Sequence, residues 1–138
     1  MRFYVASGLE NQALAKSVIE YLSGLGHLVT YDWTVHGDVR ENGEEVLTTV
    51  CLNETRAVCD AELVVVLLPG GCGTHTELGL ALASRSNKRI IVWSETGKEY
   101  LGGSDTCVFY HHPVLERISS PASQIGERIT LLLGGNFD

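Results

Sequence analysis

Six consecutive apolar residues, Leu63–Leu68, lead directly into a glycine-rich turn, and this stretch constrains the fold more than any other. An unbroken apolar run of this length is typical of a strand that is buried on both faces, as in a parallel sheet covered by helices. Pro69 and the glycines at 70, 71 and 73 end the strand and allow a tight turn. The pattern that follows predicts a helix from Thr74 to Ser86.

The glycine-rich turn predicts a binding site for an anion. Thr74 can cap the helix, so that free N–H groups and the positive end of the helix dipole converge on the turn. Glu77 follows in the first helical turn, and Thr-x-x-Glu at a helix start is also the capping box, in which the two side chains satisfy each other's backbone donors. The other interpretation is a functional carboxylate, because open α/β sheets bind their ligands at the carboxyl ends of the strands.

Strand-like and helical segments alternate along the rest of the chain. Strands are predicted over residues 2–7, 27–31, 88–93 and 107–110, and helices over residues 10–24, 44–59 and from Ser119 or Ser120 to the C-terminal region. In the last helix, Ile125, Ile129, Leu132 and Leu133 are expected to face the core. This alternation predicts a three-layer Rossmann or flavodoxin-like α/β domain with a five-stranded parallel sheet in the order 2-1-3-4-5. We expect residues 1–138 to form this one domain, with residues 134–138 as a loose tail.

The helix predicted over residues 44–59 carries a carboxylate on its apolar face. Its apolar stripe consists of Val46, Leu47, Val50, Cys51, Ala57 and Val58. This face of the helix is expected to pack inward, and Glu54 takes the position that would continue the stripe. Because a buried carboxylate is costly unless it is paired, Glu54 should have a perturbed pKa and is a functional candidate. Alternatively, Glu54 lies where the helix emerges into solvent, or it pairs with a hydroxyl group in the core.

Composition excludes several classes of function. The formal net charge is −7 and Lys and Arg form no cluster, which argues against a nucleic-acid polymer or an anionic membrane as partner. No apolar run approaches the roughly 20 residues of a membrane-spanning helix. Four cysteines without C-x-x-C or zinc-type spacing, and a strand-like rather than signal-like start, predict a reduced, cytoplasmic compartment.

Standard cofactor and catalytic motifs are not matched. Gly71-Cys-Gly73 could begin a dinucleotide fingerprint, but the third glycine position is Thr76. There is no G-x-x-x-x-G-K-[ST] and no G-x-S-x-G. His111 and His112 are neighbours, which point to opposite sides of a strand, so that a shared metal is not expected. We therefore predict no metal and no cofactor.

Most of the chain, from the first through the fourth predicted strand, resembles the nucleoside 2-deoxyribosyltransferase family, which includes the 2'-deoxynucleoside 5'-phosphate N-hydrolases. The residues that carry the resemblance are Tyr4, Glu54, Ala61-Glu62 and the string Gly73-Thr-x-x-Glu77-Leu-Gly79-x-Ala81. The resemblance implies that Glu77 attacks C1' of the sugar, that Glu54 transfers protons at the base, and that Tyr4 holds the nucleophile. It also implies at least a homodimer, with the segment 110–113 able to contribute to the neighbouring site.

Two departures from the family pattern bear on the substrate. The family usually has Asp at the positions of Glu54 and Glu62, so that the proton-transfer group here is one methylene longer. Gly71 stands where the transferases have an aspartate near the sugar 5'-hydroxyl and the phosphate hydrolases have a serine near the phosphate. The missing negative charge in an amide-rich turn favours a 5'-phosphorylated substrate. The Pro-Gly-Gly-x-Gly-Thr-x-x-Glu string is also similar to that of cytokinin-type phosphoribohydrolases, which cleave the same bond in a ribonucleotide.

The predicted reaction is a double displacement on a small-molecule nucleoside or nucleotide, as in retaining glycosidases. The helix N-terminus is expected to keep Glu77 ionised, and burial is expected to raise the pKa of Glu54. Trp33 and Asp32 are predicted to stack on and hydrogen-bond the base, although Trp33 could instead plug the sheet edge. The predicted substrate-binding residues are Ser7, Gly8, Asp32, Trp33, Pro69, Gly70, Gly71, Gly73, Thr74 and His75. The alternative from another class is a nucleotide-binding module without catalysis.

Overall fold

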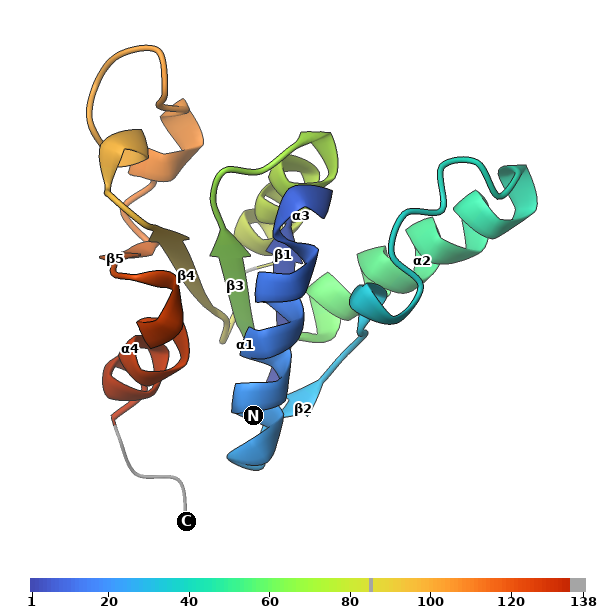
Figure 1. The fold of residues 1–138 in the computed structure, drawn as a ribbon, viewed down its shortest axis with the longest axis horizontal. Coiled ribbons are helices and arrows are strands. Elements are labelled where there is room, and N and C mark those ends of the chain that lie inside the picture. The colour runs from blue at the N-terminus through green and yellow to red at the C-terminus, as the bar shows by residue number, and fades with distance from the viewer. Residues whose placement is uncertain (85, 135–138) are drawn as a thin grey trace.

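Five parallel strands form one sheet in the order β2-β1-β3-β4-β5, as the sequence predicted. The computed structural model describes residues 1–84 and 86–134. The strands are β1 (Arg2–Ser7), β2 (Leu28–Val29), β3 (Leu63–Leu67), β4 (Arg89–Ser94) and β5 (Glu116–Ser119). The helices are α1 (Gln12–Gly24), α2 (Glu44–Asp60), α3 (Cys72–Ala83) and α4 (Ile125–Leu132). Helices α1 and α4 cover one face of the sheet, and α2 and α3 pack together on the other (Figure 1).

The central strands owe their position to their apolar sequence. Every residue of β3 is buried, because helices cover both faces of the sheet and β1 and β4 flank it in register. Residues Phe3–Ala6 of β1 are fully buried beside it. Since all strands run in parallel, the turns after β1 and β3 meet at the same edge of the sheet, where the order of the strands reverses.

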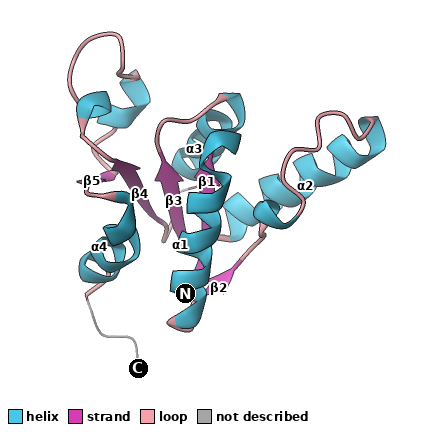
Figure 2. Ribbon diagram, viewed as in Figure 1, coloured by secondary structure: helices cyan, strands magenta, loops and turns pink. Residues whose placement is uncertain are grey.

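The fifth strand lies later in the chain than predicted. Residues 107–110 are not a strand, because Val108–His111 form a short 3₁₀ segment in which Val108 is 77% exposed (Figure 2). The edge strand is instead Glu116–Ser119, in which Ile118 is the buried residue. An edge strand that buries so little has almost no apolar periodicity, whereas the segment 107–110 before it is more apolar. The prediction of a strand over residues 107–110 is therefore wrong.

Several element boundaries also differ from the prediction. The second strand shrinks to Leu28–Val29, and the last helix begins at Ile125 rather than at Ser119 or Ser120. Within that helix Ile125 and Ile129 are buried, whereas Leu132 is 38% exposed. Helix α3 ends at Ala83; residue 85 of the predicted helix and residues 135–138 of the predicted tail lie outside the described part of the chain.

Helix α2 is anchored at its C-terminal end and extends away from the sheet at the other (Figure 1). Ala57 and Val58 are buried, but residues 44–49 are all exposed, so the prediction that the whole apolar stripe packs into the core is wrong. Lys88, itself buried, anchors the C-terminal end, since its ammonium group donates hydrogen bonds to the carbonyls of Val58, Cys59 and Ala61 at 2.7, 3.0 and 2.5 Å. These bonds satisfy carbonyls that a helix end leaves without partners.

Candidate active site

A cavity of about 660 Å³ opens where the turns after β1 and β3 meet. Its walls are the turn after β1, the loop 36–40, one face of α2 and the first two turns of α3. This is the place where open α/β sheets bind their ligands, and the volume lies in the range of small-molecule sites. Both predicted catalytic carboxylates, Glu54 from α2 and Glu77 from α3, line the cavity.

Tyr4 of the central strand β1 holds the Glu77 carboxyl group through a hydrogen bond. The Tyr4 hydroxyl, at the centre of β1, donates a hydrogen bond of 2.5 Å to Oε2 of Glu77, and the Glu77 side chain is only 8% exposed. Helix α3 begins at Cys72, two residues earlier than predicted, so that Glu77 lies in its second turn. The N-cap is Gly71, whose N–H donates to the Thr74 hydroxyl at 3.2 Å. The capping-box interpretation of Glu77 is therefore wrong, because its carboxylate binds a core tyrosine.

The environment of Glu77 favours the protonated carboxyl group. Burial raises the pKa of Glu77 to about 8; the hydrogen bond from Tyr4 opposes this shift, and the charge of Glu54 adds to it. The prediction that the helix N-terminus keeps Glu77 ionised is wrong, since a second-turn residue lies beyond the free N–H groups and burial dominates. Burial also raises the pKa of Tyr4 above its usual range, so Tyr4 stays a donor.

Glu54 faces the cavity from α2, as its place in the apolar stripe predicted. It is half-buried, and burial raises the pKa of its carboxyl group, which confirms that prediction. The nearby His36 acts in the opposite direction and lowers this pKa. The charge of Glu54 in turn raises the pKa of Glu77, so the two carboxyl groups lie close enough to interact electrostatically.

Trp33 forms part of the cavity wall, but its indole is buried and hydrogen-bonded in the core. Its Nε1 donates a hydrogen bond of 2.8 Å to the carbonyl of Val5, and its side chain is 5% exposed. This placement agrees with the interpretation of Trp33 as a plug of the sheet edge. Asp32 accepts hydrogen bonds from the backbone N–H of Thr34 at 3.0 Å and from its hydroxyl at 2.5 Å, so its carboxylate caps the 3₁₀ segment Trp33–Val35.

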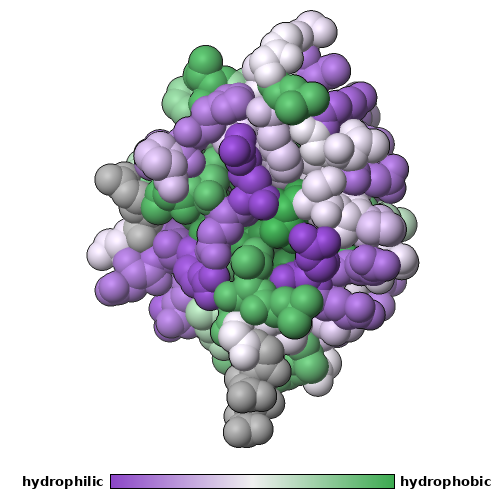
Figure 3. Space-filling model, turned by 90° about the vertical axis from the view of Figure 1, so that its left-hand side faces the viewer, coloured by the Kyte–Doolittle hydropathy of each residue, from purple (hydrophilic) through white to green (hydrophobic). Residues whose placement is uncertain are grey.

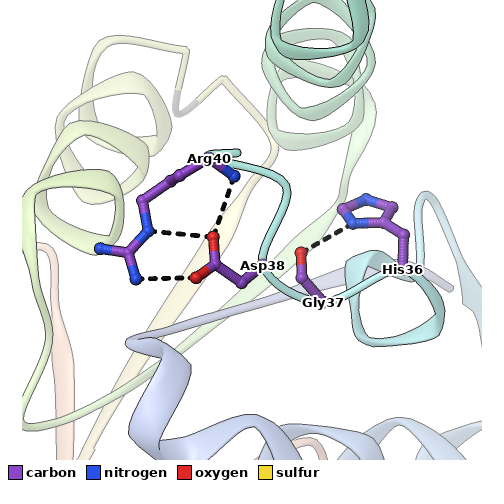
Figure 4. Close-up of polar contacts among 4 residues, drawn as sticks. All are labelled: His36, Gly37, Asp38 and Arg40. Carbon is purple, nitrogen blue, oxygen red and sulfur yellow. Dashed lines mark hydrogen bonds and ion pairs between the residues drawn. The ribbon is translucent and has the colours of Figure 1, made fainter. Parts of the chain in front are cut away.

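The loop 36–40 contributes polar groups that the sequence analysis did not single out (Figure 4). Arg40 donates hydrogen bonds to both carboxylate oxygens of Asp38, from Nε at 2.9 Å and from Nη2 at 2.7 Å. His36 contacts the Gly37 carbonyl at 2.9 Å and the Tyr31 hydroxyl at 2.7 Å. In the sequence, only the length and polarity of the segment 32–43 could have pointed to these residues. The position of the segment depends on a contact with a distant residue, because Gln12 of α1 donates a hydrogen bond to the Thr34 carbonyl at 3.1 Å.

The predicted substrate-binding residues divide into two groups. Those that line the cavity are Ser7, Gly8, Trp33, Gly71, Gly73 and Thr74. Asp32, Pro69, Gly70 and His75 are not among the lining residues. Gly70 is instead needed for packing, because a Cβ atom there would lie 2.4 Å from Cγ2 of Thr74. Glu10 was missed by the sequence analysis, and its carboxylate lies over Gly8 at the cavity wall.

The N-terminus of α3 faces the cavity with backbone N–H groups. Gly71, Cys72 and Gly73 all line the cavity, and the first turn of a helix leaves its N–H groups without intrahelical acceptors. Arg40 is the one Lys or Arg side chain on the cavity wall within residues 1–84 and 86–134. Among those same residues no group of three or more His, Cys, Asp or Glu side chains is placed to hold a metal ion. No described helix is both long and apolar enough to span a bilayer.

Solved structures share this fold. The structure of the CMP N-glycosidase BcmB from Clostridium botulinum matches with a TM-score of 0.66, over 96% of this chain and 99% of that chain, at 17% sequence identity. At this level of identity, the likeness shows a common fold. No family model and no curated protein matches the sequence.

Proposed function

We propose that this protein cleaves the N-glycosidic bond of a nucleoside 5'-monophosphate or nucleoside. The observation that carries the proposal is the pair of carboxyl groups on one cavity, with Glu77 buried on Tyr4 and Glu54 half-buried on α2. Two carboxyl groups with these environments suit nucleophile and acid–base roles at an anomeric carbon. The activity named for BcmB and the resemblance to nucleoside 2-deoxyribosyltransferases support the same reaction.

The proposed reaction has two displacements at C1'. The Glu77 carboxylate attacks C1' while the C1'–N bond breaks, and the departing base takes a proton from Glu54. Glu54, now a carboxylate, then removes a proton from water, and the resulting hydroxide replaces Glu77 at C1'. The sugar leaves with a new hydroxyl group, and both carboxyl groups return to their starting states. A second base in place of water would make the protein a transferase.

The pH dependence follows from the form that reacts, in which Glu77 is ionised and Glu54 protonated. The charge of Glu54 contributes to the raised pKa of Glu77, about 8, so Glu54 ionises first and the reactive form is a minor one that is most abundant between the two apparent pKa values of the pair; kcat/KM should therefore be bell-shaped and fall above about pH 8. Tyr4→Phe removes the hydrogen bond that lowers the pKa of Glu77, so the alkaline limb should move to higher pH. Rate profiles of both proteins between pH 5 and 10 measure the shift; a limb that stays in place contradicts the assignment of Glu77.

The substrate we favour carries a 5'-phosphate. The N–H groups at the start of α3 suit an anion, and Gly71 brings no carboxylate to the turn. The cavity also holds Glu10 and Asp38, but Asp38 is paired with Arg40. We further propose that the protein is a homodimer, in which the exposed apolar side chains Val108 and Phe109 lie at the interface.

A panel of substrates tests the proposed function. Deoxyribo- and ribonucleosides, each with and without 5'-phosphate, are incubated with the protein, and the released base is measured by chromatography. We expect release from the phosphates in preference to the nucleosides. Release from ribonucleotides alone would favour a phosphoribohydrolase, exchange with an added base would indicate a transferase, and binding without release from any substrate would identify a non-catalytic nucleotide-binding module.

The variant Gly71→Asp sharpens this test. A Cβ atom at Gly71 meets no atom within 4 Å, and its φ of −105° is accessible to every residue, so the variant should fold with Asp as a good N-cap. The added carboxylate should reduce cleavage of the 5'-phosphates by about tenfold or more through charge repulsion, and affect nucleosides less. Gly71→Asn, which caps without charge, is the matched control. Equal losses on both substrate types would contradict a phosphate at this turn.

A further inference from the structure

His75 follows the glycine-rich turn, and both of its ring nitrogens are engaged inside the protein. Nδ1 lies 2.7 Å from the carbonyl oxygen of Gly71, and Nε2 lies 2.6 Å from the hydroxyl of Tyr110. A carbonyl oxygen only accepts, so Nδ1 carries the proton, and in the neutral ring Nε2 accepts from the Tyr110 hydroxyl. The two rings also pack, with their centroids 5.7 Å apart. His75 is therefore tied to two partners and is not among the residues that line the cavity.

The contact with the Gly71 carbonyl determines where the next backbone N–H points. The carbonyl of Gly71 and the N–H of Cys72 belong to one planar trans peptide, in which they point in opposite directions. The backbone N–H of His75 at 3.2 Å and its ring Nδ1 both hold this carbonyl on the side of α3. The N–H of Cys72 must then point away from α3, toward the cavity that Gly71 and Cys72 both line.

Tyr110 gives His75 a firm support from a distant part of the chain. It lies 35 residues after His75, in the 3₁₀ segment Val108–His111, and is 5% exposed although Val108 and Phe109 beside it are 77% and 57% exposed. Figure 3, which views the molecule from the side of β5 and α4, shows hydrophobic side chains interspersed with hydrophilic ones on this face. Burial raises the pKa of Tyr110, so its hydroxyl stays protonated and able to donate.

We propose that His75 and Tyr110 are positioning residues that aim the Cys72 N–H at the 5' group of the bound substrate. The glycines at 70, 71 and 73 allow the backbone of the turn many conformations. No atom lies within 4 Å of the position that a Cβ of Gly71 would take, so we infer that the turn depends on His75 for its orientation. Neither residue touches the reacting atoms. Their contribution is to substrate binding and leaves the chemical step unchanged. This inference rests on the proposed function for the identity of the ligand.

The test compares three variants by kinetics and by binding. Tyr110→Phe removes only the hydroxyl. His75→Gln places its amide near the position of Nε2 and loses the donor to Gly71, whereas His75→Asn keeps a donor near the position of Nδ1. We expect His75→Gln and Tyr110→Phe to raise KM by about tenfold with kcat within about threefold of wild type, the loss of one hydrogen bond to a charged group. His75→Asn should show the smaller rise of the two His75 variants.

A measurement of ligand binding tests this proposal even if the protein does not catalyse the proposed reaction. Titration of ¹⁵N-labelled protein with CMP, followed through the amide signals of Cys72 and Gly73, gives Kd even if no base is released. The ¹⁵N shifts of the His75 ring should also show the proton on Nδ1. An increase in Kd that parallels KM supports the proposal. A lower melting temperature with unchanged Kd, or a loss in kcat with unchanged KM, overturns it.

Discussion

Glu77→Gln should abolish release of the base, with a loss on the order of 10³-fold or more in kcat, because an amide cannot form the glycosyl ester. Gln has the same shape, and its side-chain oxygen can still accept the hydrogen bond from Tyr4, so the cavity should be preserved. Single-turnover chromatography of released base, together with CMP titration, separates chemistry from binding. A variant that still releases base at the wild-type rate would exclude Glu77 as the nucleophile.

The same variant should be more stable than the wild type at high pH. The pKa of Glu77 is about 8 in the folded protein against 4.5 as its ordinary value, so the folded state holds a proton that the unfolded state releases between these values. This contribution to stability is present in full below pH 4.5 and is lost as the pH rises to about 8. A neutral Gln does not lose it, which is a difference on the order of 3–5 kcal/mol at pH 9.

Urea denaturation at pH 4.5 and pH 9 measures this effect. The free energies of unfolding of wild type and Glu77→Gln should nearly coincide at pH 4.5 and diverge at pH 9. Glu20→Gln, at an exposed position of α1, is the matched control and should change little at either pH. Equal stabilities of wild type and Glu77→Gln at pH 9 would mean that the Glu77 carboxyl ionises without cost in the folded protein.

The second large effect is expected for Glu54→Gln. Loss of the proton donor should slow the release of ordinary bases by about 10²- to 10⁴-fold. A 7-methylguanine nucleotide already carries a positive charge on its base and needs no proton to depart, so its cleavage should suffer much less. The ratio of kcat/KM for the two substrates, in wild type and variant, measures the acid role of Glu54 directly.

The pH profile of Glu54→Gln gives an independent check. In Glu54→Gln only Glu77 of the pair titrates, so the residual kcat/KM should rise with pH to a plateau without an alkaline limb, and the midpoint of this rise should lie below pH 8 because the charge of Glu54 no longer raises the pKa of Glu77. Glu45→Gln, an exposed position of the same helix, is the control. If both substrates lose activity equally, Glu54 shapes the cavity and does not protonate the base.

The sheet and the two carboxylates could be predicted because their signals are local. The residues of β3 are apolar without interruption since both faces are buried, and Glu54 interrupts a helical apolar stripe. The start of α3 was missed because Gly71, the true N-cap, has no side chain to mark it, whereas Thr74 is a favoured cap residue that here accepts the N–H of Gly71.

What could not be predicted depends on contacts between distant segments. The edge strand β5 buries Ile118 and carries polar neighbours, so its sequence shows no clear period. The contact of His75 with Tyr110 joins a helix to a segment that was predicted as a strand. The exposure of the outer half of α2 could not be predicted, because an apolar residue facing a cavity and one facing the core look alike in sequence.

The three hydrogen bonds from Lys88, which directly precedes β4, fix the C-terminal end of α2 to the sheet. Glu54 lies about one helical turn from this anchored end, whereas Leu47 and Val50, which also line the cavity, lie farther from it along the helix. Because a helix that is held at one end is displaced least near that end, Glu54 is the cavity-lining residue of α2 whose position this anchor fixes best.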